Sequence, residues 1–143
     1  MKYILFIPFF IGITISNIAQ EPVFEWANNF GGTSDETSVS IAVDGDGNIY
    51  STGSFSGTTD FDPGIDTVEI TSNGETDIFV AKADSLGNYI WAVSFGGTLE
   101  DEGNAISVDA SGNVFVTGFY QENVDFEPGS GTTNLNNSGD YDV

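Results

Sequence analysis

The sequence lacks most of the side chains on which familiar enzyme mechanisms depend. Its 143 residues contain no Cys, no His and only two Lys or Arg side chains, against 22 Asp and Glu. The absence of Cys and His excludes disulfides, thiol nucleophiles, zinc–thiolate sites and both Ser-His-Asp and Cys-His mechanisms. A formal net charge of −20 makes nucleic acid a poor partner, because phosphate backbones are bound through cationic side chains.

The apolar content is nevertheless sufficient for a folded protein. Apolar residues make up 39% of the chain and aromatic residues 13%, which is enough to build a packed core. Beyond residue 19, Lys82 is the only cation set against all 22 acids. We therefore expect a globular, acidic chain whose self-repulsion bound divalent cations would relieve.

The first residues have the pattern of an export signal. Lys2 precedes an apolar run from Ile4 to Ile15, and small residues follow up to Ala19. The run is shorter than the roughly 20 apolar residues that a membrane span needs. We predict a signal peptide over residues 1–19, a secreted or cell-surface location, and no membrane span after cleavage. Cleavage after Ser16 and a retained N-terminal anchor are the alternatives.

The rest of the chain contains two copies of one sequence unit, and equivalent positions lie 65 residues apart. From the pair Trp26/Trp91 to the pair Ile78/Val143 the match runs without a gap, with 20 identities among 53 pairs. The repeated elements include Phe-Gly-Gly-Thr, Gly-Asn, Thr-Gly, and Asp-Phe followed by Pro-Gly. A gapless match of this length indicates two copies of one structural module.

Each copy has the pattern of short strands joined by tight turns. In the first copy, residues 38–44 and 48–54 form one predicted hairpin, and residues 77–84 and 89–95 form a second. Residues 67–71 are a weaker fifth strand or an extended loop. No segment after the signal has a helical pattern.

A four-stranded antiparallel sheet of this size is stable only when it packs against other sheets. Solenoid rungs repeat at about 20–30 residues and propeller blades at about 40–50 or more, so a period of 65 favours the propeller. We predict an all-β fold made of antiparallel four-stranded blades of a β-propeller. Trp26 and Trp91 are expected to pack between blades rather than to stack on carbohydrate.

The motifs also resemble a known repeat family. The run Ile-x-Val-Asp-x-x-Gly-Asn, followed by Asp-Ile-Phe-Val-Ala-Lys and Trp-Ala-x-x-Phe-Gly-Gly, is similar to the SBBP repeat of bacterial β-propellers. The resemblance covers residues 23–143. It implies a secreted or surface-attached bacterial protein, often a large multidomain one, with no activity established for the repeat itself.

The repeats define the expected organisation. We predict a signal peptide at 1–19, a first repeat with an N-terminal closing strand at 20–90, and a second, shortened repeat at 91–143. About two blades are present, whereas a closed ring generally needs at least four. The expectation is therefore an incomplete ring, from a fragment of a longer protein or a truncated product; the alternative is a ring completed by several chains.

One turn has the alternating oxygen ligands with which calcium loops begin. Asp44, Asp46 and Asn48 are the candidate calcium ligands, and no other cofactor is expected. The complete calcium-loop pattern fails, because Ile49 and Phe55 stand at two of its required positions. The same residues also suit a hairpin turn, in which Asp and Asn close local hydrogen bonds.

The segment Asp60-Phe61-Asp62-Pro63-Gly64 and its copy at 125–129 place two acids around one aromatic residue. Strand alternation predicts a loop pinned by a buried Phe, with its acids in solvent or on a cation.

Taken together, these features predict a non-enzymatic binding or scaffold module of a larger bacterial surface or extracellular protein, with a protein or carbohydrate ligand and structural calcium at its acidic turns. The alternative is a fragment of a propeller glycoside hydrolase that uses paired carboxylates. No pair stands out among the 22 acids, and no catalytic residue is assigned.

Overall fold

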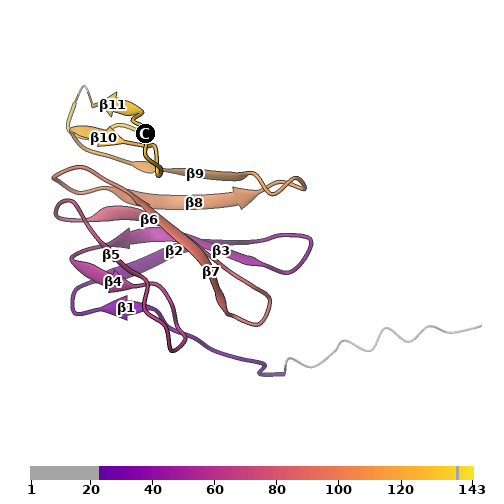
Figure 1. Ribbon diagram of the computed structural model, residues 1–143. Helices are drawn as coiled ribbons and strands as arrows, with labels where there is room; N and C mark the ends of the chain where they lie inside the picture. The colour runs from indigo at the N-terminus through magenta and orange to yellow at the C-terminus, as the bar shows by residue number, and fades with distance from the viewer. Residues whose placement is uncertain (1–22, 138) are drawn as a thin grey trace, which may run out of the picture.

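The computed structural model describes residues 23–137 and 139–143. The predicted signal peptide at 1–19 lies outside the described residues. Within those residues every regular element is a β-strand, and no helix is long and apolar enough to cross a membrane (Figure 1).

The strands follow one another in the order expected of two related units. The first unit contains β1 (Gly31–Gly32), β2 (Glu36–Val43), β3 (Ile49–Phe55), β4 (Thr58–Asp60), β5 (Glu69–Thr71), β6 (Asp77–Ala83) and β7 (Tyr89–Phe95). The second contains β8 (Glu102–Val108), β9 (Val114–Phe119), β10 (Asn123–Asp125) and β11 (Asn134–Asn136).

The largest sheet is a four-stranded antiparallel meander in the order β2-β3-β6-β7. Its two hairpins are those expected from the alternation of apolar and polar residues. Gly47 and Gly87 close the hairpin turns at φ 83° and 84°, a left-handed conformation that glycine adopts without a steric cost.

The remaining strands form three smaller antiparallel sheets. β1, β4 and β5 form one sheet, which confirms a strand within the weak run at 67–71. β8 pairs with β9, and β10 pairs with β11. The prediction of an all-β fold of antiparallel sheets is confirmed, and within the described chain none of the sheets closes on itself.

The two units repeat each other in backbone detail. β2 carries a bulge between Ser38 and Ser40, and β8 carries one at the equivalent positions, Gly103 and Ala105. Opposite each bulge the neighbouring strand has a glycine, because a Cβ at Gly53 would lie 1.8 Å from the Thr37 carbonyl oxygen, and one at Gly118 would lie 2.0 Å from that of Glu102.

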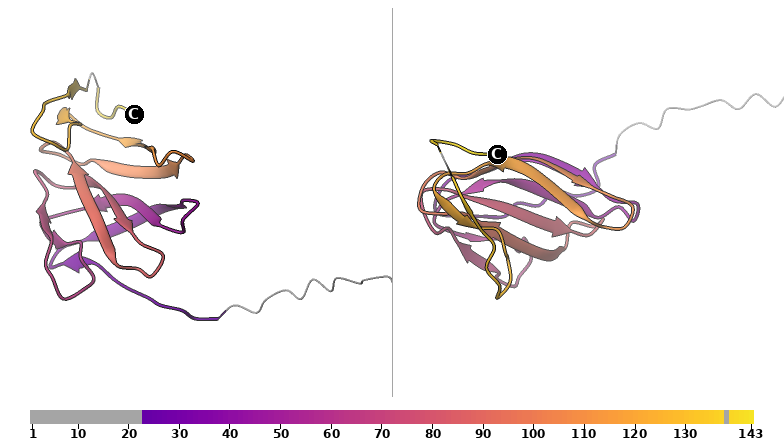
Figure 2. Two further views of the ribbon diagram at one scale, coloured as in Figure 1. Left: turned by 45° about the vertical axis from the view of Figure 1, so that its right-hand side comes forward. Right: turned by 90° about the horizontal axis from the view of Figure 1, so that it is seen from above.

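The β8–β9 hairpin lies as a layer over one face of the larger sheet (Figures 1 and 2). Ile106 on β8 packs against Tyr50 and Val80, and all three are at most 8% exposed. Half-buried apolar residues surround them, Val108 and Val114 from the hairpin and Trp91, Val93 and Phe95 from the sheet. The stacking of one repeat on the next is therefore an apolar contact between sheet faces.

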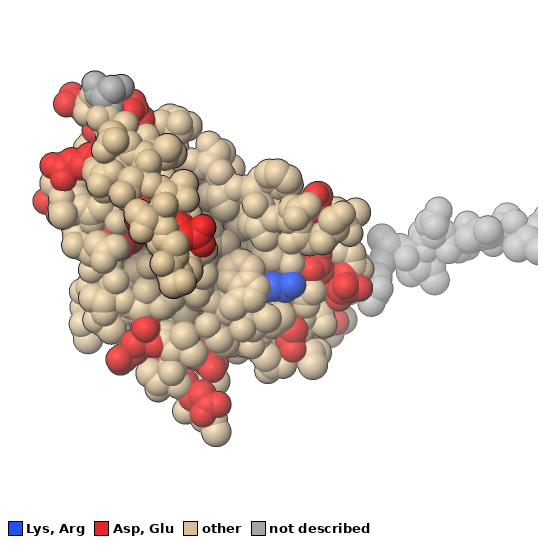
Figure 3. Space-filling model, turned by 45° about the horizontal axis from the view of Figure 1, so that its top comes forward, with Lys and Arg blue, Asp and Glu red and all other residues tan. Residues whose placement is uncertain are grey.

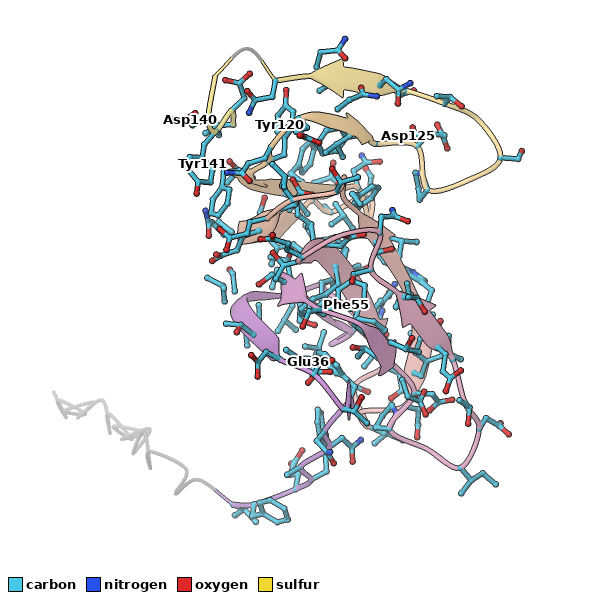
Figure 4. All side chains as sticks on the ribbon, turned by 90° about the vertical axis from the view of Figure 1, so that its left-hand side faces the viewer. Glu36, Phe55, Tyr120, Asp125, Asp140 and Tyr141 are labelled. Atoms are coloured by element: carbon cyan, nitrogen blue, oxygen red, sulfur yellow. The ribbon has the colours of Figure 1, made fainter. Side chains whose placement is uncertain are left out.

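The opposite face of the larger sheet is covered by the β4–β5 insertion and by the chain before β1. Phe55, Phe61 and Phe79 are at most 2% exposed and form the centre of this second core. Phe30, Ile70 and Tyr89 pack around them. Figure 4 shows Phe55 inside this part of the molecule.

The two tryptophans differ in a way that the sequence did not predict. Trp91 lies where expected, between the larger sheet and the β8–β9 layer, with its ring 6.2 Å from that of Tyr50. Trp26 is 37% exposed, and its indole N–H donates to the Ser85 carbonyl at the β6–β7 turn. The expectation of an inter-sheet Trp26 was wrong, because among the described residues no sheet stacks over the segment that carries it.

Candidate functional site

The three hairpin turns that begin at Asp44, Asp84 and Asp109 share one geometry. In each, the Asp Oδ1 accepts the backbone N–H groups two and four residues later, and Oδ2 accepts the side-chain N–H of the Asn four residues later. All nine donor–acceptor distances lie between 2.7 and 3.0 Å. These bonds hold the turn closed and occupy both carboxylate oxygens.

The same bonds favour the ionised form of all three carboxyl groups. Hydrogen bonding from the Asn48 side chain is the main cause that lowers the pKa of Asp44 to about 2. The side chains of Asn88 and Asn113 likewise lower the pKa of Asp84 and Asp109. Each turn therefore carries a fixed negative charge at neutral pH.

The structure brings the predicted calcium ligands into one turn. Asp44 accepts from the backbone of Asp46 and from both the backbone and the side chain of Asn48, while Asp46 itself lies exposed. Across residues 23–137 and 139–143, no group of three or more acidic side chains is arranged to hold a metal ion. Calcium at Asp44, Asp46 and Asn48 stays a prediction.

The turns at Asp44 and Asp109 form the two rims of a cleft of about 550 Å³, which we call the turn cleft. It is lined mainly by the two turns, with Val43, Val108, Tyr50 and Lys82 between them. It arises because stacking β8–β9 on β2–β3 sets the two equivalent turns side by side.

Lys82 supplies the positive charge of the turn cleft. Its Nζ lies 3.8 Å from Asp44 Oδ2 and 4.7 Å from the centre of the Tyr50 ring. The Tyr50 hydroxyl donates to the same Asp44 oxygen at 3.1 Å. The Tyr50 side chain, and then the carboxylates of Asp44 and Asp46, raise the pKa of Lys82. Figure 3 shows a blue group beside red acidic groups, while other acids are spread around the molecule; Lys82 is the only Lys or Arg among the described residues.

The two Asp-Phe insertions are loops in which an acidic side chain accepts backbone hydrogen bonds from the same loop. Asp60 Oδ1 accepts the backbone N–H groups of Asp62 and Val68, and the copy repeats this with Asp125, Glu127 and Thr133. Phe61 is 2% exposed, so the prediction of a loop pinned by a buried Phe is confirmed for the first copy. Phe126 is half-buried.

Two buried acids were not identified from the sequence. Asp77 and Asp101 are both fully buried, at 0% exposed. Asp101 accepts the N–H groups of Gly97 and Gln121, while Asp77 Oδ2 accepts that of Asn73. Asp77 Oδ1 has no hydrogen-bond partner among the described residues. The sequence offered a signal for Asp77 alone, which is identical to its counterpart Asp142, whereas Asp101 has Glu36 as its counterpart.

The environment of these acids opposes their ionisation. Burial raises the pKa of Asp77 and of Asp101, and the negative charge of Asp101 adds to the effect on Asp77. Because neither side chain reaches solvent, neither is placed to exchange protons with a substrate.

Comparison with known proteins gives two similarities. The chain is 30% identical over 119 residues to an uncharacterized WD repeat-containing protein of Acanthamoeba polyphaga mimivirus, a match that covers 73% of this chain and 9% of that protein. It is 32% identical over 118 residues to the regulatory protein FlaEY of Caulobacter vibrioides, covering 82% of this chain and 12% of FlaEY.

These similarities support a propeller-type repeat, and neither relative is named as an enzyme. The chain spans only 9% and 12% of the length of these relatives. No family model matches the chain, so the SBBP type is not identified specifically. No solved structure gives a significant match.

Proposed function

We propose that this chain is an exported, propeller-type repeat module that binds a protein partner through the turn cleft. Similarity to a WD repeat-containing protein and the stacking of two equivalent β-hairpins support a propeller-type module. Binding is the function that suits such a module, because its exposed turns recur at regular spacing on a rigid sheet scaffold.

The observation that carries the proposal is the turn cleft itself. Its two rims are copies of one turn, and each rim carries an ionised Asp fixed in position by the turn's own hydrogen bonds. One cation, Lys82, lies between them. A surface of this kind selects a partner by charge and shape, with basic groups directed to the rims.

Site-specific cross-linking tests this assignment. A photoreactive amino acid at Ser111, on the rim of the turn cleft, is expected to capture one discrete protein from the producing cells. The same probe at Ile65, which is fully exposed on a different loop, serves as the control. Asp46→Lys, on the opposite rim, should abolish the Ser111 cross-link, because it repels basic groups of the partner. Equal capture from both positions, or capture that survives Asp46→Lys, contradicts binding at the turn cleft.

We also propose that calcium binds at Asp44, Asp46 and Asn48 and stabilises the first turn. Millimolar calcium should then raise the thermal unfolding midpoint more than magnesium does, because a ligand of the folded state stabilises it. Asp46→Ser converts the first turn to the sequence type of the third, which has Ser111 at that position. The calcium effect should disappear in this variant; an unchanged midpoint in the parent chain rules the site out.

We propose that the protein is exported, on the basis of the signal-peptide pattern in its first 19 residues. The mature protein, recovered from the cell surface or medium of a bacterial host, should begin at Gln20. N-terminal sequencing gives the answer directly, and an intact Met1 on the recovered protein contradicts cleavage.

A further inference from the structure

Asp77 and Asp101 lie together at the junction between the two repeats. Asp77 is the first residue of β6, and Asp101 immediately precedes β8, which runs beside β6 (Figure 1). The Asp101 N–H donates to the Thr76 carbonyl at 3.0 Å, and Thr76 and Glu100 form a parallel bridge. These contacts hold the backbone at one acid against the residue that precedes the other.

Both carboxylates approach the same pair of glycines in the repeated Phe-Gly-Gly-Thr motif. Asp101 Oδ2 accepts the Gly97 N–H at 2.7 Å. A Cβ at Gly96 would lie only 2.2 Å from the Asp77 Cγ and 2.4 Å from its Oδ1. The two acids therefore share one small enclosed region, in which both are 0% exposed.

The hydrogen bonds in this region do not use all the oxygen lone pairs of the two side chains. Asp101 accepts from Gly97 and from Gln121, and Asp77 Oδ2 accepts from Asn73. Two ionised carboxylates offer about eight acceptor positions. Asp77 Oδ1 has no hydrogen-bond partner within the described part of the chain. A fully buried oxygen in this state is costly unless a positively charged group faces it.

No side chain of the described residues supplies that positive charge. Lys82, their only Lys or Arg, lies toward the other end of β6. It is engaged there with Asp44 and the Tyr50 ring. Because buried charges are normally paired, the two junction acids require compensation from outside the chain.

The equivalent acid of the first repeat, Glu36, has a different environment. Glu36 Oε1 accepts the Gly32 N–H at 2.7 Å and also the Thr59 hydroxyl at 2.9 Å. Val124 occupies the position equivalent to Thr59, so Asp101 has no such hydroxyl donor. Glu36 is also partly exposed, whereas Asp101 is fully buried. The uncompensated charge is thus a property of the junction and not of the repeated motif in general.

We propose that Asp77 and Asp101 bind one calcium ion at the junction between the repeats, with Asp77 Oδ1 among its ligands. Two carboxylates are neutralised by one divalent cation. Calcium accepts carboxylate and backbone carbonyl oxygens in irregular geometry, whereas magnesium gives up its waters reluctantly and suits a position without solvent access poorly.

Backbone carbonyl groups are available as further ligands. A Cβ at Gly74 would lie 2.7 Å from the Gly97 carbonyl oxygen and 2.5 Å from that of Thr98. Gly74 follows Asn73, whose N–H donates to Asp77, so these carbonyls lie against the loop that holds the Asp77 carboxylate. The described residues place no group of three acidic side chains around a metal position, so carbonyls would have to complete the shell.

The junction site is separate from the calcium site proposed at Asp44, Asp46 and Asn48. Asp46 is exposed, so an ion at that turn exchanges readily with solvent. Asp77 and Asp101 are closed off, so we expect their calcium to stay bound during dialysis. An ion held there would join β6 of the first repeat to the start of β8 and add to the apolar contact between the sheets.

Metal analysis of the full chain tests this proposal. The parent for the test carries Asp46→Ser, which removes a ligand of the turn site, and is purified with calcium and then dialysed against metal-free buffer. We expect about one calcium ion per chain, and its loss in Asp77→Asn and in Asp101→Asn. Asp66→Asn removes an exposed acid from the loop after β4 and is the matched control, which should retain the ion.

Thermal unfolding provides a second measurement. A strong chelator should lower the midpoint of the parent and of Asp66→Asn, and should leave that of Asp77→Asn unchanged. At pH 8, Asp77→Asn should be less stable than the calcium-loaded parent. It should be more stable than the chelated parent, because burial of an unpaired charge is then uncompensated.

Three results would overturn the proposal. They are a dialysed parent without calcium, equal calcium in the parent and Asp77→Asn, which indicates an adventitious ion only, and equal chelator shifts in these two chains. Asp101→Asn replaces Asp77→Asn in each comparison if the latter does not fold. None of these results bears on the turn cleft, which the cross-linking at Ser111 tests separately.

Discussion

The two repeats have nearly the same sequence pattern, yet equivalent residues differ sharply in exposure. Tyr50 is 2% exposed, whereas its counterpart Phe115 is 58% exposed. The reverse holds for Ile41, at 66%, and its counterpart Ile106, at 8%. The stacking order explains both pairs, because Ile106 lies against Tyr50, while Ile41 and Phe115 lie on the two outer faces of the stack.

This comparison teaches that each module has two apolar faces and that its position in the stack decides which is buried. The pattern of strands and turns comes from local sequence. Burial comes from the neighbouring sheet, which supplies the other half of each core. The following changes test this distinction, beginning with the one of largest expected effect.

Phe61 and Phe126 are counterparts at the 65-residue offset and differ in burial. Phe61→Ala should cost about 3–5 kcal/mol, because it empties an almost fully buried site in the first repeat. Phe126→Ala should cost less than half as much, since that ring is only half-buried. Urea unfolding measures both, and equal losses would contradict the difference between the repeats.

Gly53 and Gly118 face equivalent bulges. Gly53→Ala should destabilise the chain by about 1–3 kcal/mol, because the new Cβ would collide with the Thr37 carbonyl oxygen. The strand that carries Gly53, β3, is paired with β2 on one edge and with β6 on the other, which restricts its movement. Gly118→Ala should cost less, because the β8–β9 hairpin has more freedom to shift. Gly45→Ala is the control, with nothing within 4 Å of the added carbon. A larger loss at Gly118 would reverse the comparison.

Gly57 and Glu122 occupy equivalent positions with left-handed backbones, at φ 65° and 60°. Glu122→Gly should stabilise the second repeat by about 1 kcal/mol, because a side chain in this conformation is strained. The gain is partly offset by loss of the 2.5 Å hydrogen bond between Thr98 Oγ1 and Glu122 Oε2. Gly57→Ala should destabilise, since its Cβ would also lie 2.7 Å from Ser34 Oγ. The midpoint of thermal unfolding should rise for Glu122→Gly and fall for Gly57→Ala.

In the ion-free chain, the buried carboxyl groups and the turn carboxyl groups should contribute to the stability of the fold with opposite dependence on pH. Burial raises the pKa of Asp77 above its unfolded value, so its favourable contribution is present at low pH and is lost as pH rises through the folded-state pKa. Asp77→Asn should therefore become more stable than the parent as pH increases from 3 to 8.

Asp44 shows the reverse behaviour. Its pKa is lowered to about 2, so its contribution is present above the ordinary value near 3.8 and is lost as pH falls toward 2. The difference in thermal unfolding midpoint between the parent chain and Asp44→Asn should disappear below pH 3. The midpoint of thermal unfolding across the pH range measures both effects, and a pH-independent gap for either variant would contradict the assigned cause.

Much of this fold followed from the sequence, because the 65-residue offset, the alternating strands and the Gly-containing turns are local signals. The buried Phe61 was predicted for the same reason. The exposure of Trp26, the burial of Asp77 and Asp101, and the contact of Lys82 with Tyr50 were not predicted. Each depends on which segments meet in space, and the repeat pattern carries no such information.

The contact between the repeats is tested most directly by a double-mutant cycle on Tyr50→Leu and Ile106→Ala, read by urea unfolding. Stacking of the two modules predicts a coupling energy of about 1 kcal/mol for this pair, and none for Tyr50→Leu with Ile41→Ala. Zero coupling between positions 50 and 106, or equal coupling with position 41, would contradict the stacked arrangement.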